Sequence, residues 1–263
     1  CGIGINQTVY RHGCLSLTLA DINKPDFETR IRSIWKWYGP SRLIELSLEH
    51  LVDAYFEELT EKMIEESIFE MKYMHHTCVK VNNFDEIAGM FNNFVFEGAQ
   101  GLLLSERNMH WYPHLTRSDT GVTNAMAILD ETDSTIIDSL DVIYLTRPYL
   151  TRHGEGPLIE EWDVVPYRGV VDNTNVPNDW QGTIRYAPLN FDLMTDQVKD
   201  DFARCRYPAD NHLWITCWDQ IENQATFHIT DGSYFVEHSP SGLLQATKEQ
   251  FRNFNVRPVG LQR

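Results

Sequence analysis

The first quarter of the chain carries apolar residues at the three-to-four-residue spacing of helices. A first segment begins at Pro25 and Asp26 and ends at Gly39 and Pro40, residue types typical of helix starts and stops. Ser41 is placed to cap a second, longer segment, in which glutamates lie largely opposite the apolar residues. The two apolar faces comprise Phe27, Ile31, Ile34 and Tyr38, and then Leu43, Leu46, Leu51, Tyr55, Phe56, Leu59 and Met63. We predict two amphipathic helices whose apolar faces pack into a core.

Further along, short apolar runs alternate with helical patterns. The dipeptide Asp231-Gly232, between the runs 225–229 and 233–236, is typical of a tight β-hairpin turn. The other predicted elements are strands at 77–81, 93–97, 141–146 and 213–217, and helices at about 86–91, from an Asn190 cap to about 204, and at 243–251. This alternation predicts one α/β domain over residues 1–263. We expect a mostly parallel central sheet flanked by helices, with an antiparallel hairpin added near the C-terminus.

Composition narrows the class of protein. The 263 residues include 22 basic and 38 acidic side chains, a net charge of −16, and 42% are hydrophobic, enough for a full core. No apolar run approaches the ~18 residues that span a bilayer, and no basic-then-apolar leader opens the chain. The negative surplus disfavours binding to nucleic acid or to an anionic membrane. We therefore expect a cytoplasmic globular protein, for which small phosphorylated ligands remain open.

The cysteines and histidines do not form a recognisable metal motif. The five cysteines are odd in number and contain no CxxC pair, which predicts reduced thiols rather than disulfides or structural zinc. His75, His76 and Cys78 superficially resemble ligands, but adjacent histidines point in different directions and no fourth ligand has matching spacing. We predict no metal-ligating residue in this chain. Cys1 stands where a Met is expected and leads at once into a glycine loop at 2–4, which indicates the later part of a longer polypeptide.

Two acidic clusters have the residue types of glycosidase carboxylate pairs. They comprise Asp130, Glu131 and Asp133, and Glu160, Glu161 and Asp163. Because the chain holds 38 acidic residues, such clusters are expected by chance. We interpret both as solvated surface.

Three loops combine glycine with polar side chains in a way that suits a ligand. In the first, Gly98 and Gly101 permit close backbone approach, and Gln100 offers both a donor and an acceptor to a base edge. The second, 112–121, gathers hydroxyls, a guanidinium and a glycine, which suits capture of a phosphate. The third, 149–157, places Arg, His and two glycines after a strand. Each loop alone is equally typical of a structural turn, but three of them favour a binding site.

In their order along the chain, these loops resemble motifs of the adenylosuccinate synthetases. The segments that carry the resemblance are 96–101, Tyr112-Pro113 with Thr116, and Thr151-Arg152-His153-Gly154-Glu155-Gly156-Pro157. It extends to Gly2-Ile3-Gly4 with Arg11, to Gln181-Gly182-Thr183-Ile184-Arg185, and to Thr216-Cys217-Trp218-Asp219. The resemblance therefore spans nearly the whole chain.

The resemblance implies a ligase. Such an enzyme phosphorylates the 6-oxygen of a purine monophosphate with a nucleoside triphosphate and Mg²⁺, and the aspartate amine then displaces the phosphate. Phosphorylation must come first because the amide-like C6 oxygen is a poor leaving group until it becomes a phosphate ester. The implied partners are the monophosphate, L-aspartate and a second copy of the chain in a homodimer.

The resemblance also assigns roles by position. It places the purine nucleotide at Gly98, Gln100, Thr116, His153 and Arg11, aspartate at Thr183 and Arg185, and the base of the triphosphate at Trp218, Asp219 and Gly260. Gln100 is the catalytic candidate, near the 6-position of the purine. Thr116 takes the monophosphate, His153 the ribose, and Arg11 reaches into the partner subunit's site. Arg185 supplies the planar fork of donors that suits a carboxylate.

The chain departs from the family pattern in three places. The family's phosphate-cradling loop, with its acidic residue and later histidine, would precede Cys1. Cys217-Trp218 stands where guanine-specific members carry a lysine before the aspartate, here Asp219, so Trp218 is free to stack on a purine. The stretch after Asp219 is short, as in compact archaeal and phage members. The phage variant joins aspartate to dGMP and accepts adenine nucleotides as phosphate donor, and in that case the enzyme works in the host cytoplasm. The donor stays open between ATP, dATP and GTP. The alternatives are an ordinary IMP-using synthetase and a non-catalytic nucleotide-binding module.

Overall fold

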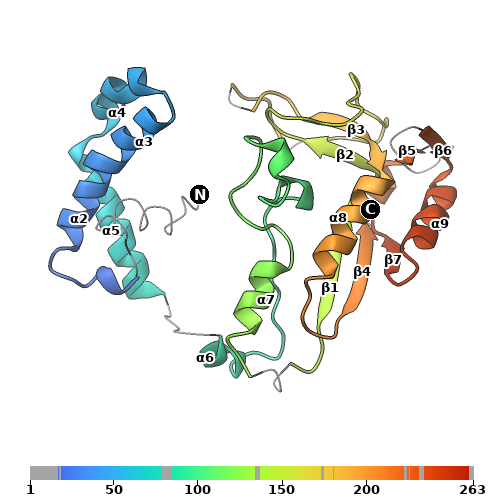
Figure 1. The fold of residues 1–263 in the computed structure, drawn as a ribbon, viewed down its shortest axis with the longest axis horizontal. Helices are drawn as coiled ribbons and strands as arrows, with labels where there is room; N and C mark the ends of the chain where they lie inside the picture. Colours follow the sequence, from blue (N-terminus) through green and yellow to red (C-terminus); the bar gives the residue numbers. More distant parts are fainter. Residues whose placement is uncertain are drawn as a thin grey trace. The chain divides into compact units, whose positions relative to one another are not determined.

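The chain folds into two compact units, Cys1–Asn82 and Asn83–Arg263 (Figure 1). The structure, a computed structural model, describes residues 17, 19–78, 84–133, 137–172, 175–179, 181–221, 224, 226–230 and 234–260. The predictions for the glycine loop at 2–4, for Arg11 and for the turn at Asp231-Gly232 lie outside the described residues.

The described part of the first unit is helical. Its elements are η1 (Leu19–Asp21), α2 (Phe27–Ser33), the π-helical turn η2 (Ile34–Tyr38), α3 (Gly39–Glu45), η3 (Glu49–Leu51), α4 (Val52–Glu58) and α5 (Glu61–Thr77). The hydroxyl of Thr60 caps α5 by accepting a hydrogen bond from the Met63 N–H. Phe27, Ile31, Ile64 and Ile68 form the buried core of this unit.

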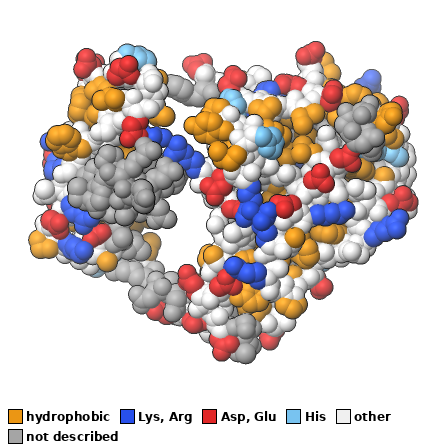
Figure 2. Space-filling view, viewed as in Figure 1, with side chains coloured by type: hydrophobic (Ala, Val, Ile, Leu, Met, Phe, Trp, Pro, Cys, Tyr) orange, Lys and Arg blue, Asp and Glu red, His pale blue; other side chains and the backbone are white. Residues whose placement is uncertain are grey.

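The first predicted helix begins as expected, directly after Asp26, but its predicted end and the predicted length of the second helix were wrong. Helical residues continue through Gly39 and Pro40, because proline is tolerated in the first turn of α3 and Gly39 keeps a helical φ of −56°. The second predicted helix is instead broken into α3, α4 and α5. Much of its predicted apolar face is exposed, including Leu46 at 50% and Phe56 at 48%. Figure 2 shows apolar side chains on the surface near α3 and α4.

The second unit contains two sheets. The first is parallel, in the order β1 (Asp141–Thr146), β4 (Asp210–Ile215) and β7 (Asn255–Pro258). The second has the order β2 (Tyr149–Arg152), β3 (Arg185–Asn190), β5 (Thr226–Thr230) and β6 (Tyr234–His238). In it β3 and β5 are parallel, whereas the other pairs are antiparallel. The predicted α/β class is confirmed, as is the hairpin strand pair β5 and β6, although the sequence did not indicate a second sheet.

Helices connect and cover these sheets. They are α6 (Asp85–Ala88), α7 (Thr123–Leu129), α8 (Phe191–Phe202) and α9 (Pro240–Gln250), with short turns η4 (Leu102–Leu104), η5 (Met109–Trp111) and η7 (Trp218–Gln220). Asn190 caps α8 as predicted, since its side chain accepts a 2.9 Å hydrogen bond from the Leu193 N–H. Among the described residues, no helix combines the length and the apolarity needed to cross a bilayer.

Of the predicted strand 77–81, residues 79–81 lie outside the described residues, and Thr77 ends α5. The predicted strand 93–97 was wrong. These residues form no regular structure, Val95 is 92% exposed, and no strand in the described part of the chain pairs with them. The aromatic residues of this run pack instead, with the Phe94 ring 4.8 Å from that of Phe84.

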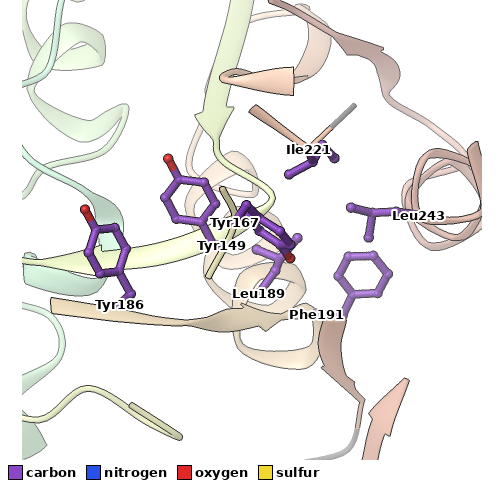
Figure 3. Packing of buried hydrophobic residues seen from close by; sticks show 7 residues of the cluster. All are labelled: Tyr149, Tyr167, Tyr186, Leu189, Phe191, Ile221 and Leu243. Atoms are coloured by element: carbon purple, nitrogen blue, oxygen red, sulfur yellow. The ribbon is translucent and has the colours of Figure 1, made fainter. Parts of the chain in front are cut away.

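Helix α8 joins two hydrophobic clusters. Phe191 belongs to the cluster in Figure 3, with Tyr149, Tyr167, Tyr186, Leu189, Ile221 and Leu243. Val198 belongs to the other, with Leu213, Ile215, Phe251 and Val256. Each sheet therefore packs against the same helix, which fixes the loops that follow β1, β2 and β4 within one rigid framework.

Candidate functional site

Arg185, at the start of β3, lies at the centre of a hydrogen-bonded loop cluster. It pairs in register with Arg152 at the end of β2. Its Nη1 donates to the carbonyls of Gly154 and Gly156, both at 2.9 Å. Its Nε donates to Oε1 of Glu161 at 2.7 Å, and its Nη2 pairs with the other carboxylate oxygen. The hydrogen bond to Glu161 raises the pKa of Arg185.

Arg152 fastens the loop after β2 to the second polar loop. Its guanidinium donates to the carbonyls of Glu155 at 3.1 Å, Pro157 at 3.2 Å and His114 at 3.0 Å. Gly156, at a φ of +112°, permits this approach, since a Cβ there would lie 2.6 Å from the Cβ of His114. Burial, with the positive charge of Arg185, lowers the pKa of Arg152.

The residues predicted to bind the substrate aspartate, Thr183 and Arg185, lie next to His153, the residue predicted to bind the ribose. The Gly154 N–H donates to the Gln181 carbonyl at 3.1 Å, which ties the loop that carries His153 to the turn that carries Thr183. His153 and Thr183 are both exposed. The structure therefore brings His153, Thr183 and Arg185 to one set of connected loops.

The first and second polar loops are also joined. A Cβ on Gly98 would lie 3.1 Å from the Thr120 carbonyl, and the Thr120 hydroxyl donates to the Gly101 carbonyl at 3.1 Å. The Thr116 N–H donates to the Leu104 carbonyl at 2.9 Å. Gln100 is exposed and has a left-handed φ of +75°. All three loops singled out in the sequence thus belong to one connected assembly.

Asp119 and Asp201 hold the second loop in place. Asp119 pairs with Arg107 and accepts a 2.9 Å hydrogen bond from the Gly121 N–H. Burial opposes ionisation of Asp119, but these hydrogen bonds outweigh it and lower its pKa. Asp201, on α8, is buried, and burial raises its pKa. These carboxylates line a polar cavity of about 310 Å³ with Leu102, Ser105, Arg107, Asn108, Gln197, Asp200 and Arg204.

A second group of predicted residues meets where the parallel strands end. Trp218 follows β4, and its backbone N–H donates to the Val259 carbonyl at 3.2 Å. Gly260 follows β7, and a Cβ there would lie 3.3 Å from Oδ1 of Asp219. Trp218, Asp219 and Gly260 are therefore brought together. The Trp218 ring is half-buried and packs against both hydrophobic clusters, so only part of it can face a base.

The sequence did not point to the residues that hold the loops together, which are Glu161, Asp201 and Arg152. No site role was predicted for any of them. Arg152 was within a quoted motif, but its three carbonyl partners depend on how the loops pack. Across the described ranges, no three or more His, Cys, Asp or Glu side chains come together to hold a metal ion. The described residues thus offer no cage for Mg²⁺, which in nucleotide sites is often held by phosphates and one or two carboxylates.

Comparison with known proteins agrees with the motifs. The family model for adenylosuccinate synthetase matches residues 2–182. The comparison with curated proteins returns no match. The family comprises ligases that join a purine nucleotide to aspartate, generally with GTP and Mg²⁺. The match covers more than half of the chain, and the chain belongs to the adenylosuccinate synthetase family.

Proposed function

We propose that this chain acts as a ligase that joins L-aspartate to a purine monophosphate, with dGMP as acceptor and ATP, dATP or GTP as phosphate donor. The observation that carries the proposal is the Arg185 guanidinium, which hydrogen-bonds the loop next to His153. A carboxylate-binding arginine is thereby coupled to a loop assigned to the nucleotide. The choice of the phage-type acceptor is supported by Trp218, which stands in place of the lysine of guanine-specific members.

In the proposed reaction, the purine N1 gives up its proton, the 6-oxygen bonds to the terminal phosphorus of the donor, and the nucleoside diphosphate leaves. Mg²⁺ would supply charge neutralisation for the phosphates. The aspartate nitrogen then bonds to C6, the C6–O bond breaks, inorganic phosphate leaves, and the amine loses a proton to solvent. Gln100 orients the 6-position, Thr116 the monophosphate and His153 the ribose. Thr183 and Arg185 hold the aspartate carboxylates, while Trp218, Asp219 and Gly260 take the donor base.

We further propose that the chain acts as one α/β domain within a homodimer, with Arg11 reaching into the partner subunit's site. In the phage-encoded case, the enzyme works in the host cytoplasm. The ordinary IMP-using synthetase is the alternative acceptor specificity. A nucleotide-binding module without turnover is the alternative class.

The test is turnover by the full polypeptide with Mg²⁺ and L-aspartate, offering dGMP or IMP with ATP, dATP or GTP, followed by phosphate release and product mass. We expect the succinylated dGMP product with ATP or dATP. Preference for IMP with GTP would replace the phage-type assignment, and binding without turnover would support the module.

Arg185→Ala should reduce aspartate-dependent turnover by at least about a hundredfold, because a charge-assisted bidentate contact is lost. Phosphate release and the KM for aspartate measure this effect. An unaltered aspartate KM in this variant would remove Arg185 from the aspartate site.

A further inference from the structure

The guanidinium of Arg185 has almost no free donor. An arginine carries five N–H donors. Both Nη1 hydrogens are directed to backbone carbonyls, of Gly154 and of Gly156, and the edge formed by Nε and Nη2 is occupied by both oxygens of Glu161. One Nη2 hydrogen remains. A substrate carboxylate can therefore bind this arginine in bidentate fashion only if it replaces Glu161 or breaks the carbonyl contacts.

Of these two sets of partners, Glu161 is the one that can leave. Its side chain is 36% exposed, against 25% for that of Arg185, so water can solvate the released carboxylate. The pair with Arg185 lowers the pKa of Glu161 and keeps it ionised at neutral pH. The Gly154 and Gly156 carbonyls, by contrast, belong to a backbone that Arg152 also holds. Exchange at Glu161 leaves the loop next to His153 intact.

The backbone keeps Glu161 beside Arg185 without fixing its side chain. Trp162, the next residue, donates its N–H to the Tyr186 carbonyl at 2.8 Å, and Tyr186 directly follows Arg185. Glu160, the preceding residue, has a left-handed φ of +55°, an unfavourable conformation for a residue with a Cβ. Among the described residues, the Glu161 carboxylate has no hydrogen bond or ion pair other than those with Arg185, so rotation about its side-chain bonds is enough to release it.

We propose that Glu161 is a positioning residue for the amino-acid substrate: its carboxylate holds the Arg185 fork in the empty enzyme and is exchanged for a carboxylate of L-aspartate on binding. This inference rests on the proposed function, because it takes Arg185 as the aspartate-binding arginine. Glu161 therefore competes with aspartate and sets its affinity. The purine nucleotide, which does not use this edge of Arg185, is unaffected by the exchange.

The experiment compares Glu161→Gln with wild type in the full polypeptide. We expect the KM for L-aspartate to fall about two- to fivefold, the range that an exposed ion pair contributes, with kcat and the nucleotide KM unchanged. Titration calorimetry with L-aspartate in the presence of the acceptor monophosphate should show the same tighter binding without turnover. Glu160→Gln removes the same charge one residue away and should leave both constants unaltered.

The outcomes separate this inference from the proposed function. A purely structural ion pair would give the opposite result, a raised aspartate KM and weaker binding, and this or an unchanged value overturns the role of Glu161. If Glu161→Gln gives a raised or unchanged aspartate KM but Arg185→Ala loses aspartate use, the role of Glu161 fails and the proposed function is retained. If Arg185→Ala binds and uses aspartate normally, both proposals fail.

Discussion

Gly121 is the residue at which one added methyl group should disturb the site most. A Cβ there would lie 2.7 Å from Oδ2 of Asp201 and closer still to Oδ1. The Asp201 carboxylate is not a loose side-chain end that can swing aside. It is buried, accepts the Tyr144 hydroxyl at 2.8 Å, and accepts the Val122 N–H at 3.2 Å to each oxygen. Gly121→Ala must therefore push the loop away from α8 or expel the carboxylate.

Both ways of relieving the overlap are costly. Overpacking of this kind typically costs about 1–3 kcal/mol. If the carboxylate moves, the half-buried Tyr144 hydroxyl and the Val122 N–H lose their acceptor, which costs about a further 1–3 kcal/mol. We expect Gly121→Ala to lower the free energy of unfolding by about 2–6 kcal/mol. Because Thr120 contacts Gly98 and Gly101, the KM for the purine monophosphate should rise as well.

Urea denaturation, followed by tryptophan fluorescence, measures the change in the free energy of unfolding. Gly89→Ala is the matched control. Gly89 follows α6, has a φ of −75°, and a Cβ there meets nothing within 4 Å. The control should be neutral or stabilised by up to about 1 kcal/mol. Equal stability of the two alanine variants would refute the argument that Asp201 is pinned against Gly121.

Two further substitutions test other parts of the same framework. Arg152→Lys should raise the KM for the purine monophosphate about tenfold or more, because a lysine cannot replace the fork that binds the carbonyls of His114, Glu155 and Pro157. Steady-state kinetics at saturating aspartate measures this, and an unchanged nucleotide KM would show that the fork is dispensable. His228 is stacked between Phe191 and His238, and burial, with the nearby His238, lowers its pKa to about 4 from an ordinary value of 6.5. Since the folded state disfavours the charged ring, its contribution to stability is complete above pH 6.5 and is lost as pH falls through 4. Between about pH 7 and pH 4.5, the free energy of unfolding of His228→Gln should fall by about 2 kcal/mol less than that of wild type, as measured by urea denaturation. If the two proteins lose stability in parallel over this range, the lowered pKa of His228 is contradicted.

Elements encoded by local pattern were predictable from the sequence. The run 141–146 coincides with β1, and Asn190 caps α8, because each signal lies within a few consecutive residues. The run 93–97 failed although its residues are typical of a strand. Strand propensity reflects packing against neighbours, and no strand among the residues that the structure describes pairs with this segment. A glycine followed by proline usually marks the end of a helix. Here a π-helical turn precedes Gly39-Pro40, and the proline lies in the first turn of α3, so helical structure continues.

The same distinction explains which parts of the site could be found without a structure. The residues proposed to meet a ligand, such as Gln100 and Thr116, belong to short contiguous motifs, so a resemblance can assign them a role. Glu161 gave no such signal. It lies in an acidic cluster, and its importance depends on the bridge between Trp162 and Tyr186, which places it against an arginine 24 residues further along the chain. Because the β2–β3 pairing also sets Arg152 opposite Arg185, one strand register positions both guanidinium groups and the carboxylate between the loops. If Arg185 binds aspartate as proposed, the affinity for aspartate depends on strand pairing as much as on the motif, and substitutions at Glu161 will change it without altering any residue of the family motifs.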